Sequence, residues 1–162
     1  MHILIKNKKL IYNNYRIKCA VGKRGIRNKK EEGDLITPIG LHKINYILYR
    51  KDRIKKLDTI LKKLPIKKNM GWCDDSKSKK YNKLIKIEKK IKHEKLIRKD
   101  HKYDLLIPIK YNFKKPISDL GSCIFVHLTK DYKPTAGCIA LKKKDFLIIL
   151  KLIKKNSKIK IF

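Results

Sequence analysis

The chain has 162 residues, 42% of them hydrophobic, which is enough for one packed domain over residues 1–162 and argues against wholesale disorder. Its formal net charge of +31 favours anionic partners such as nucleic acid, acidic lipid or an anionic cell wall. No run of about 18 apolar residues occurs, and the apolar patch at residues 3–5 is shorter than a secretory signal requires, so the sequence predicts neither a membrane span nor a signal peptide.

The positive charge is nearly all lysine and is spread along the whole chain. Only six arginines occur, at positions 16, 24, 27, 50, 53 and 98. Proteins that read bases or phosphates favour Arg, whose planar group donates two parallel hydrogen bonds. Isoleucine and asparagine are frequent and valine occurs only twice, so we interpret the lysine excess as compositional. We therefore expect no specific nucleic-acid partner, and a basic polyanion-binding protein with structural Cys and His remains the alternative.

The first part of the chain has the pattern of short strands joined by turns. Apolar or alternating pieces at residues 3–5, 10–12 and 15–21 are separated by Asn and Lys, which predicts strands. The two glycines of "GKRG" at 22–25 predict a turn. The stretch "EEGDLITPIG" at 31–40 predicts a loop that leads into another strand.

A helix is predicted over residues 52–64. The apolar residues of this segment follow the spacing of one helical face: Ile54, Leu57, Leu61 and Leu64. Asp52 is the expected N-cap, and Pro65 would end the helix.

The second half of the chain predicts buried strands and a further helix. Residues 103–112 and 121–128 have the character of core strands, and the second of these ends near His127. Residues 144–155 have the length and apolar stripe of a helix, and residues 158–162 form an alternating strand. Many short strands with one or two helices indicate an α+β fold in which β-structure dominates.

Cys138 lies between a glycine and a short apolar run in "KPTAGCIAL". A cysteine nucleophile needs a basic partner, because an ordinary thiol with a pKa of about 8.5 is only a few per cent thiolate at neutral pH. His127 lies at the end of a predicted strand, and the loop between the two residues is long enough to bring imidazole and thiol together. Gly137 permits close approach of a substrate, and its amide and that of Cys138 are candidates for an oxyanion hole. Spacing alone leaves open a core Cys and a strand-end His that never meet.

The remaining cysteines form no Cys-x-x-Cys pair. Cys123 lies inside an apolar strand and is most simply a small core residue. A zinc site built from Cys73, Cys123, His127 and Cys138 matches no common ligand spacing. The spacing therefore does not favour a zinc site.

These segments together resemble the L,D-transpeptidase family with the YkuD-type catalytic domain, in its short single-domain bacterial branch. The family signature is a His, a loop and then Ser/Thr-x-Gly-Cys. "FVHL" and "PTAGCIAL" match it with His127, Thr135, Gly137 and Cys138. The stretch at 31–40 looks like the family's Gly-Asp-x-x-Thr-Pro-x-Gly segment, and "GWCDD", "YDLLIPIKYN" and "GSCIFVH" look like the short branch. The resemblance covers most of the chain.

The resemblance implies a β-sandwich or barrel with one or two helices and a cysteine-dependent acyl transfer. Cys138 would attack the carbonyl after the third residue of a peptidoglycan tetrapeptide stem, release D-Ala and form a thioester. An amine of another stem, a lipoprotein or water would resolve the thioester, so an L,D-carboxypeptidase is an alternative. His127, oriented by the Leu128 carbonyl, would move the proton. Thr135, Gly137 and Cys138 would surround the oxyanion, and the reaction would require no metal ion and no organic cofactor.

One position departs from the family pattern, in which many members carry Arg two residues after the nucleophile. This chain has Ala140 there, and the lysines at 142–144 are the nearest replacements. Trp72, Asp74 and Asp75 are candidate cleft residues, although a packed Trp beside a capped turn explains the same segment. We expect stem peptides as partners and a monomeric protein. The resemblance implies a cell-envelope location, whereas the lack of a visible signal leaves the cytoplasm open.

Overall fold

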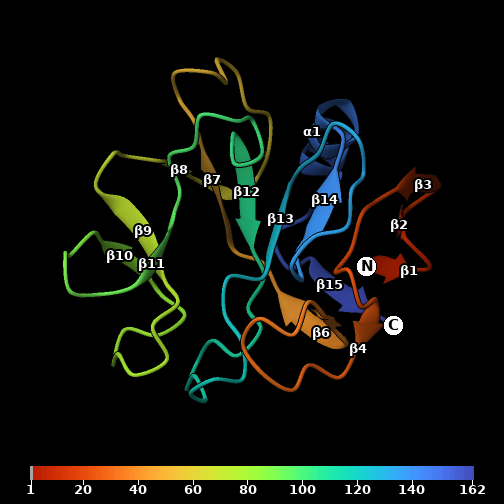
Figure 1. Ribbon diagram of the computed structural model, residues 1–162. Helices are drawn as coiled ribbons and strands as arrows, with labels where there is room; N and C mark the ends of the chain where they lie inside the picture. The colour runs from red at the N-terminus through yellow and green to blue at the C-terminus, as the bar shows by residue number, and fades with distance from the viewer. Residues whose placement is uncertain (1) are drawn as a thin grey trace.

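The computed structural model describes residues 2–162, in which β-strands dominate and one helix occurs (Figure 1). The first five-stranded sheet contains, in spatial order, β3 (Tyr15–Lys18), β2 (Lys9–Tyr12), β1 (Ile3–Lys6), β15 (Lys158–Ile161) and β6 (Gly40–Lys43). The second contains β14 (Ile139–Leu141), β13 (Phe125–Leu128), β12 (Leu105–Pro108), β7 (Tyr46–Tyr49) and β8 (Lys62–Pro65). A three-stranded sheet contains β10 (Leu84–Lys86), β9 (Met70–Cys73) and β11 (His93–Lys95). β4 (Ile26–Arg27) and β5 (Thr37–Pro38) form a separate pair.

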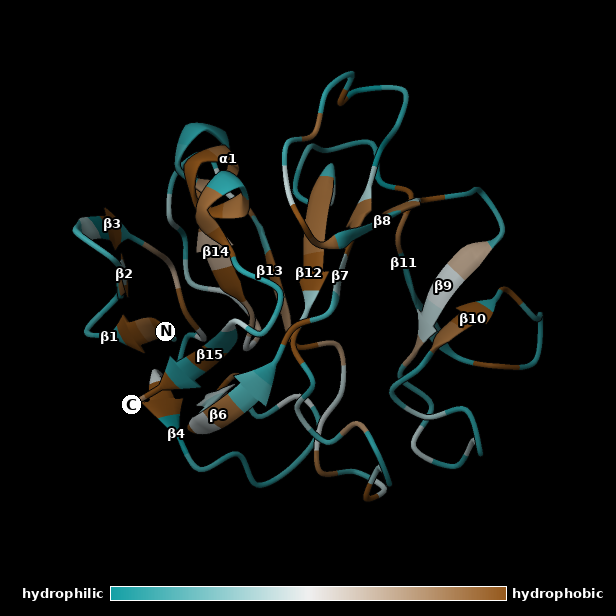
Figure 2. Cartoon of the chain, turned by 180° about the vertical axis from the view of Figure 1, so that it is seen from behind, coloured by the Kyte–Doolittle hydropathy of each residue, from teal (hydrophilic) through white to brown (hydrophobic). Residues whose placement is uncertain are grey.

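The second sheet lies between two hydrophobic clusters. All residues of β12 and β13 are buried, and alternate side chains of a strand point to opposite faces. Leu105, Ile107 and Val126 belong to the larger cluster, which includes residues of the first sheet and of the helix. Leu106 and Phe125 belong to the smaller cluster, which includes residues of the three-stranded sheet. Because both faces are covered, these strands are almost continuously apolar (Figure 2).

Helix α1 (Lys143–Leu152) lies beside β14 in both views of the chain (Figures 1 and 2). Its buried residues Phe146, Ile149 and Leu150 follow the i, i+3, i+4 spacing of one helical face and join the larger cluster. The predicted helix at 144–155 is therefore confirmed, as is the α+β class with dominant β-structure. No helix within residues 2–162 has both the length and the apolar character needed to span a membrane.

The predicted helix at 52–64 is wrong. Residues 51–61 form turns and bends, and the segment ends in strand β8, which pairs in parallel with β7. Three of its apolar residues are buried in the larger cluster: Ile54, Leu57 and Leu61. Asp52 does not cap a helix, because both of its carboxylate oxygens accept hydrogen bonds from Arg50. The helical spacing of these residues thus reflects three separate contacts of an irregular loop with the core. The pairing of β8 with β7 overrides the helical propensity of the end of the segment.

Candidate active site

The pairing of β13 with β14 brings His127 and Cys138 to one face of the second sheet. Phe125 and His127 are two residues apart on β13 and therefore share a face, the face covered by the smaller cluster. β14 runs parallel to β13 with Val126 opposite Ile139, which places Cys138 next to Phe125. The Phe125 N–H donates to Cys138 Sγ at 3.4 Å, and the thiol donates to the Cys123 carbonyl at 3.1 Å.

The turn before Cys138 is held by hydroxyl groups from two segments. Thr37 Oγ1 donates to the Gly137 carbonyl at 2.8 Å and accepts from the Gly22 N–H at 2.8 Å. Thr135 Oγ1 accepts from the Gly137 N–H at 3.1 Å and donates to the Cys138 carbonyl at 2.6 Å. Gly137 has a φ of +139°, and a Cβ there would lie 2.8 Å from the Ile36 carbonyl oxygen. The stretch at 31–40 therefore supports the turn that presents Cys138.

The backbone amides around Cys138 differ in their availability. The Gly137 N–H is engaged by the Thr135 hydroxyl. The Cys138 N–H has no hydrogen-bond acceptor anywhere in the described part of the chain. This amide is therefore free to donate to an oxygen that develops negative charge next to the thiol.

The orientation and tautomer of His127 are set by the next residue. Nδ1 lies 2.9 Å from the Leu128 carbonyl oxygen, which only accepts hydrogen bonds, so Nδ1 carries the proton. Nε2 is then the atom with a free lone pair and can act as a base. The Tyr103 ring and the imidazole pack in a T-shaped arrangement, with ring centroids 5.6 Å apart and an interplanar angle of 66°. Tyr103 itself is fixed by a hydrogen bond of 2.9 Å from its hydroxyl to Glu94 Oε1.

Burial keeps the thiol and the imidazole neutral at neutral pH. Burial raises the pKa of Cys138 to about 12, and the hydrogen bond from Phe125 offsets this only in part. The pKa of His127 is lowered to about 4, mainly by burial; the charges of Lys102 and Arg98 contribute to the decrease, while the Leu128 carbonyl and Asp100 oppose it. The resting pair is therefore thiol and imidazole rather than thiolate and imidazolium.

Both groups border a cleft of about 510 Å³. Asp74, one of the three candidate cleft residues, also borders this cleft. Trp72 does not border it: its side chain is 1% exposed, donates from Nε1 to Asn82 Oδ1 at 2.9 Å and packs edge-on against Phe125. Asp75 lies outside the lining and accepts a hydrogen bond from a nearby backbone N–H. Within residues 2–162, no group of three or more His, Cys, Asp or Glu residues is arranged to hold a metal ion.

The residue at the family's usual Arg position lies inside the cleft without a charge. Ala140 borders the cleft and is the register partner of His127 on the neighbouring strand. None of the lysines at 142–144 borders the cleft, because they lie beyond β14 at the start of α1. The cations of the cleft instead include Arg98 and Lys102, which precede β12. Sequence reasoning did not identify these two residues, because nothing local distinguishes them in a chain so rich in lysine.

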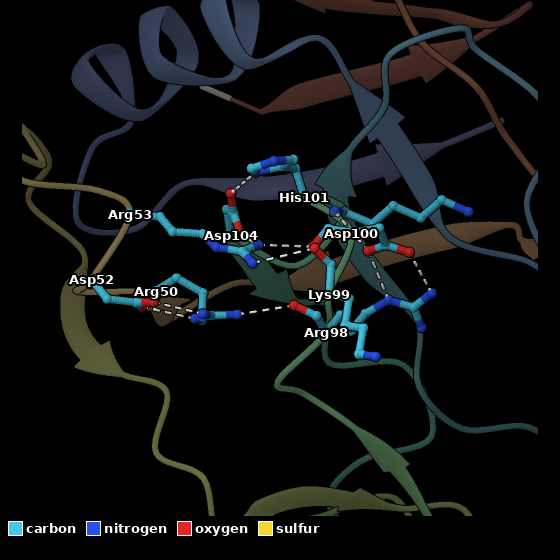
Figure 3. Close-up of polar contacts among 9 residues, drawn as sticks. Arg50, Asp52, Arg53, Arg98, Lys99, Asp100, His101 and Asp104 are labelled. Carbon is cyan, nitrogen blue, oxygen red and sulfur yellow. Dashed lines mark hydrogen bonds and ion pairs between the residues drawn. The ribbon is translucent and has the colours of Figure 1, made fainter.

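The loop between β11 and β12, which carries these two cations, is fixed by two arginines (Figure 3). Arg50 donates to the backbone carbonyl of Arg98 at 3.1 Å. Arg53 donates to the backbone carbonyls of residues 99 and 100 at 3.2 and 2.9 Å, and its Nη1 pairs with Asp104 Oδ1 at 2.9 Å. Three loop carbonyls are thus satisfied by side chains more than forty residues away in the sequence.

Cys138 and His127 border one cleft, the imidazole has a defined tautomer, and the Cys138 N–H has no acceptor in the described residues. A thiol, a base and a free backbone amide are the groups that nucleophilic acyl transfer requires. A search of curated proteins gives no match. The family model for the L,D-transpeptidase catalytic domain, YkuD, matches residues 1–161. The chain therefore belongs to the L,D-transpeptidase family with the YkuD-type catalytic domain.

Proposed function

We propose that this protein is a peptidoglycan L,D-transpeptidase in which Cys138 is the nucleophile. The observation that supports the proposal is that the Cys138 thiol borders the same cleft as an imidazole whose Nδ1 proton is held on the Leu128 carbonyl, which leaves Nε2 free to act as the base. Membership of the family supports peptidoglycan stem peptides as substrates. The specific substrate is a tetrapeptide stem whose fourth residue is D-Ala.

In the first half-reaction, His127 Nε2 takes the thiol proton while Cys138 Sγ attacks the carbonyl carbon of the third stem residue. The carbonyl oxygen becomes an oxyanion and accepts a hydrogen bond from the Cys138 N–H, which is free in the resting protein. When the C–N bond breaks, its electron pair goes to the D-Ala nitrogen, which takes the proton from the imidazolium. Cys138 is left as a thioester, and His127 is neutral again.

In the second half-reaction, the side-chain amine of another stem attacks the thioester carbonyl and gives a proton to His127. The C–S bond breaks, the sulfur leaves as thiolate, and the imidazolium returns its proton to the sulfur. The new amide bond is the cross-link. Water in place of the amine would give an L,D-carboxypeptidase, and a lipoprotein amine would give an attached lipoprotein.

Intact-protein mass spectrometry after incubation with a tetrapeptide-stem muropeptide tests the proposal. We expect an adduct with the mass of the tripeptide stem, release of D-Ala, and a cross-linked product when an amine acceptor is added. Cys138→Ala should form no adduct. His127→Ala should lose about 10²- to 10⁴-fold in the acylation rate, the usual contribution of a general base.

Cys123→Ala is the matched control because it removes a second thiol from the same cleft and leaves Cys138 in place. An adduct that persists in Cys123→Ala and disappears in Cys138→Ala assigns the thioester to Cys138. If the native protein forms no adduct and the stem stays intact, the proposal fails. Hydrolysis without transfer to an amine would assign the carboxypeptidase reaction instead.

We also propose that the protein acts in the cell envelope, because cross-linked peptidoglycan lies there. Fractionation of the producing cells, followed by immunoblotting against this chain, tests the location. Recovery of the protein only with the cytoplasm would contradict the proposal.

A further inference from the structure

The cations that border the cleft differ in whether they have a carboxylate partner. Among the described residues 2–162, four lysines and arginines border it: Lys29, Arg98, Lys102 and Lys133. Three of them form ion pairs: Lys29–Asp34, Arg98–Asp100 and Lys133–Asp131. Lys102 has no carboxylate within ion-pair distance of its ammonium group in the described residues 2–162. Its charge is therefore available to an anionic group that enters the cleft.

The backbone of Lys102 is anchored directly beside the base. Its carbonyl accepts from the Leu128 N–H at 2.9 Å, and its own N–H donates to Asp100 Oδ1 at 3.1 Å. The Leu128 carbonyl is in turn the group that holds His127 Nδ1. The base and Lys102 are thus fixed through the same residue of β13, and the charge of Lys102 acts on the imidazole.

The chemistry of the proposed reaction places a carboxylate on this side of the cleft. His127 must reach the nitrogen of the leaving amino acid to protonate it. In a tetrapeptide stem that amino acid is the last residue, and its free carboxylate carbon is two covalent bonds, about 2.5 Å, from the nitrogen. The carboxylate therefore lies close to the imidazole in any productive complex. Of the cleft cations, the unpaired one is anchored next to that imidazole.

We propose that Lys102 binds the terminal carboxylate of the leaving amino acid and so selects stems that end one residue after the cleaved bond. This inference rests on the proposed function, which it extends by naming the residue that recognises the donor's end. A stem with a further residue presents a neutral amide at this position and loses the ion pair. Ala140, the register partner of His127 on β14, carries no charge. The cation that binds the carboxylate is therefore Lys102, which comes from the β11–β12 loop instead of β14.

The ion pair would assist the proton transfer as well as binding. Formation of the imidazolium beside the unneutralised charge of Lys102 is unfavourable, because two like charges would then lie together. A substrate carboxylate neutralises Lys102 and removes this penalty. Loss of the carboxylate should therefore reduce kcat as well as raise KM. The Arg50 and Arg53 contacts keep the loop in place for this role (Figure 3).

The test compares two tetrapeptide stems that differ only at the C-terminus, one a free carboxylate and the other a carboxamide. The readout is the rate of adduct formation on Cys138 and of release of D-Ala or D-alaninamide. For the native protein we expect kcat/KM to favour the free acid by about 10- to 100-fold, as for one charge-assisted hydrogen bond. Lys102→Met should bring the two substrates to within about threefold of each other. Lys102→Arg should retain most of the preference.

Lys144→Met is the matched control, because Lys144 is an exposed lysine outside the cleft and its loss changes the net charge by the same amount. We expect this variant to keep the native preference for the free acid. Equal rates on both stems in the native protein would overturn the inference while leaving the thioester mechanism intact. A preference that survives in Lys102→Met, or that falls equally in Lys144→Met, would also overturn it. If neither stem acylates Cys138, the proposed function fails, and the inference fails with it.

Discussion

The neutral resting state of the Cys138–His127 pair makes a specific prediction about thiol reactivity. Iodoacetamide reacts with the thiolate, so its rate reports the ionised fraction. A pKa of about 12 leaves about one Cys138 thiol in 10⁵ ionised at pH 7. An ordinary cysteine with a pKa of about 8.5 is about 3% ionised at that pH, which is a difference of about 3,000-fold. The greater nucleophilicity of the more basic thiolate restores a factor of about 40. Cys138 should therefore be alkylated about 10²-fold more slowly than a free thiol.

The assay follows alkylation at Cys138 by peptide mass spectrometry from pH 5 to pH 10, with glutathione in the same tube as the reference thiol. The rate should rise by about tenfold per pH unit above pH 7, with no plateau, because the ionised fraction rises in that proportion. His127→Ala should change the alkylation rate little while slowing acylation by a stem peptide by about 10²- to 10⁴-fold. The alkylation rate and the acylation rate together distinguish His127 as a general base from His127 as the imidazolium of a preformed ion pair with Cys138.

A plateau of rapid alkylation between pH 5 and pH 8 that disappears in His127→Ala would refute this reasoning. That result would mean that a thiolate–imidazolium pair already exists in the free protein, as in other cysteine enzymes. Because burial is the main cause of both pKa shifts, the cleft would then have to be more hydrated than its lining indicates.

Three further predictions concern stability. The pKa of His127 is lowered from its ordinary value to about 4, so only the unfolded chain takes up the proton between pH 6.5 and pH 4. The contribution of neutral His127 to the free energy of unfolding is therefore present in full above pH 6.5. That free energy, measured by urea denaturation, should fall by about 3 kcal/mol as the pH drops to 4. The same decrease in His127→Leu would contradict the assignment of this pH dependence to His127. Thr37→Val removes the hydroxyl that bridges Gly22 and Gly137 and should cost about 1–3 kcal/mol by the same assay; an unchanged midpoint would show that the bridge is not needed. Trp72→Phe should cost about 1–2 kcal/mol through the lost hydrogen bond and packing but leave kcat/KM within about twofold, and a large loss of activity would place Trp72 at the substrate.

The sequence was sufficient to predict two of the strands next to the site, β12 and β13, but not β14. β12 and β13 are buried on both faces, so their residues are almost all apolar, and this pattern is visible without any structure. Helix α1 was predicted for a similar reason, since its buried residues follow a helical spacing. The spacing of His127 and Cys138 allowed a base and a nucleophile without requiring that the two side chains meet, and the resemblance of the surrounding segments to the L,D-transpeptidase signature is what singled out the two residues.

Other features depend on contacts between distant segments, which local patterns do not encode. The loop at 51–61 has helical apolar spacing, but its residues are anchors for the core, and Asp52 is used by Arg50 instead of capping a helix. The support of Gly137 by Thr37 joins residues one hundred positions apart. The role of Trp72 could not be decided from the sequence either, because a buried indole and a cleft indole have the same neighbours in the chain.

Several of the arginines, unlike most of the lysines, have specific structural roles in this chain. Lysine makes up nearly all of the positive charge, yet three of the six arginines gather around one loop: Arg50, Arg53 and Arg98. Each uses the planar, many-donor geometry of guanidinium, which a lysine ammonium cannot reproduce, to reach backbone carbonyls or both oxygens of a carboxylate. The ammonium group of Lys102 is sufficient for its proposed ligand, which is a single carboxylate at the end of a mobile peptide, because binding that ligand does not require the planar geometry of guanidinium. The loop that the arginines hold is the one that presents Lys102 beside His127. The high net charge attracts anions from all directions, so the proposed selectivity for the end of a stem rests on this fixed lysine and not on the total charge.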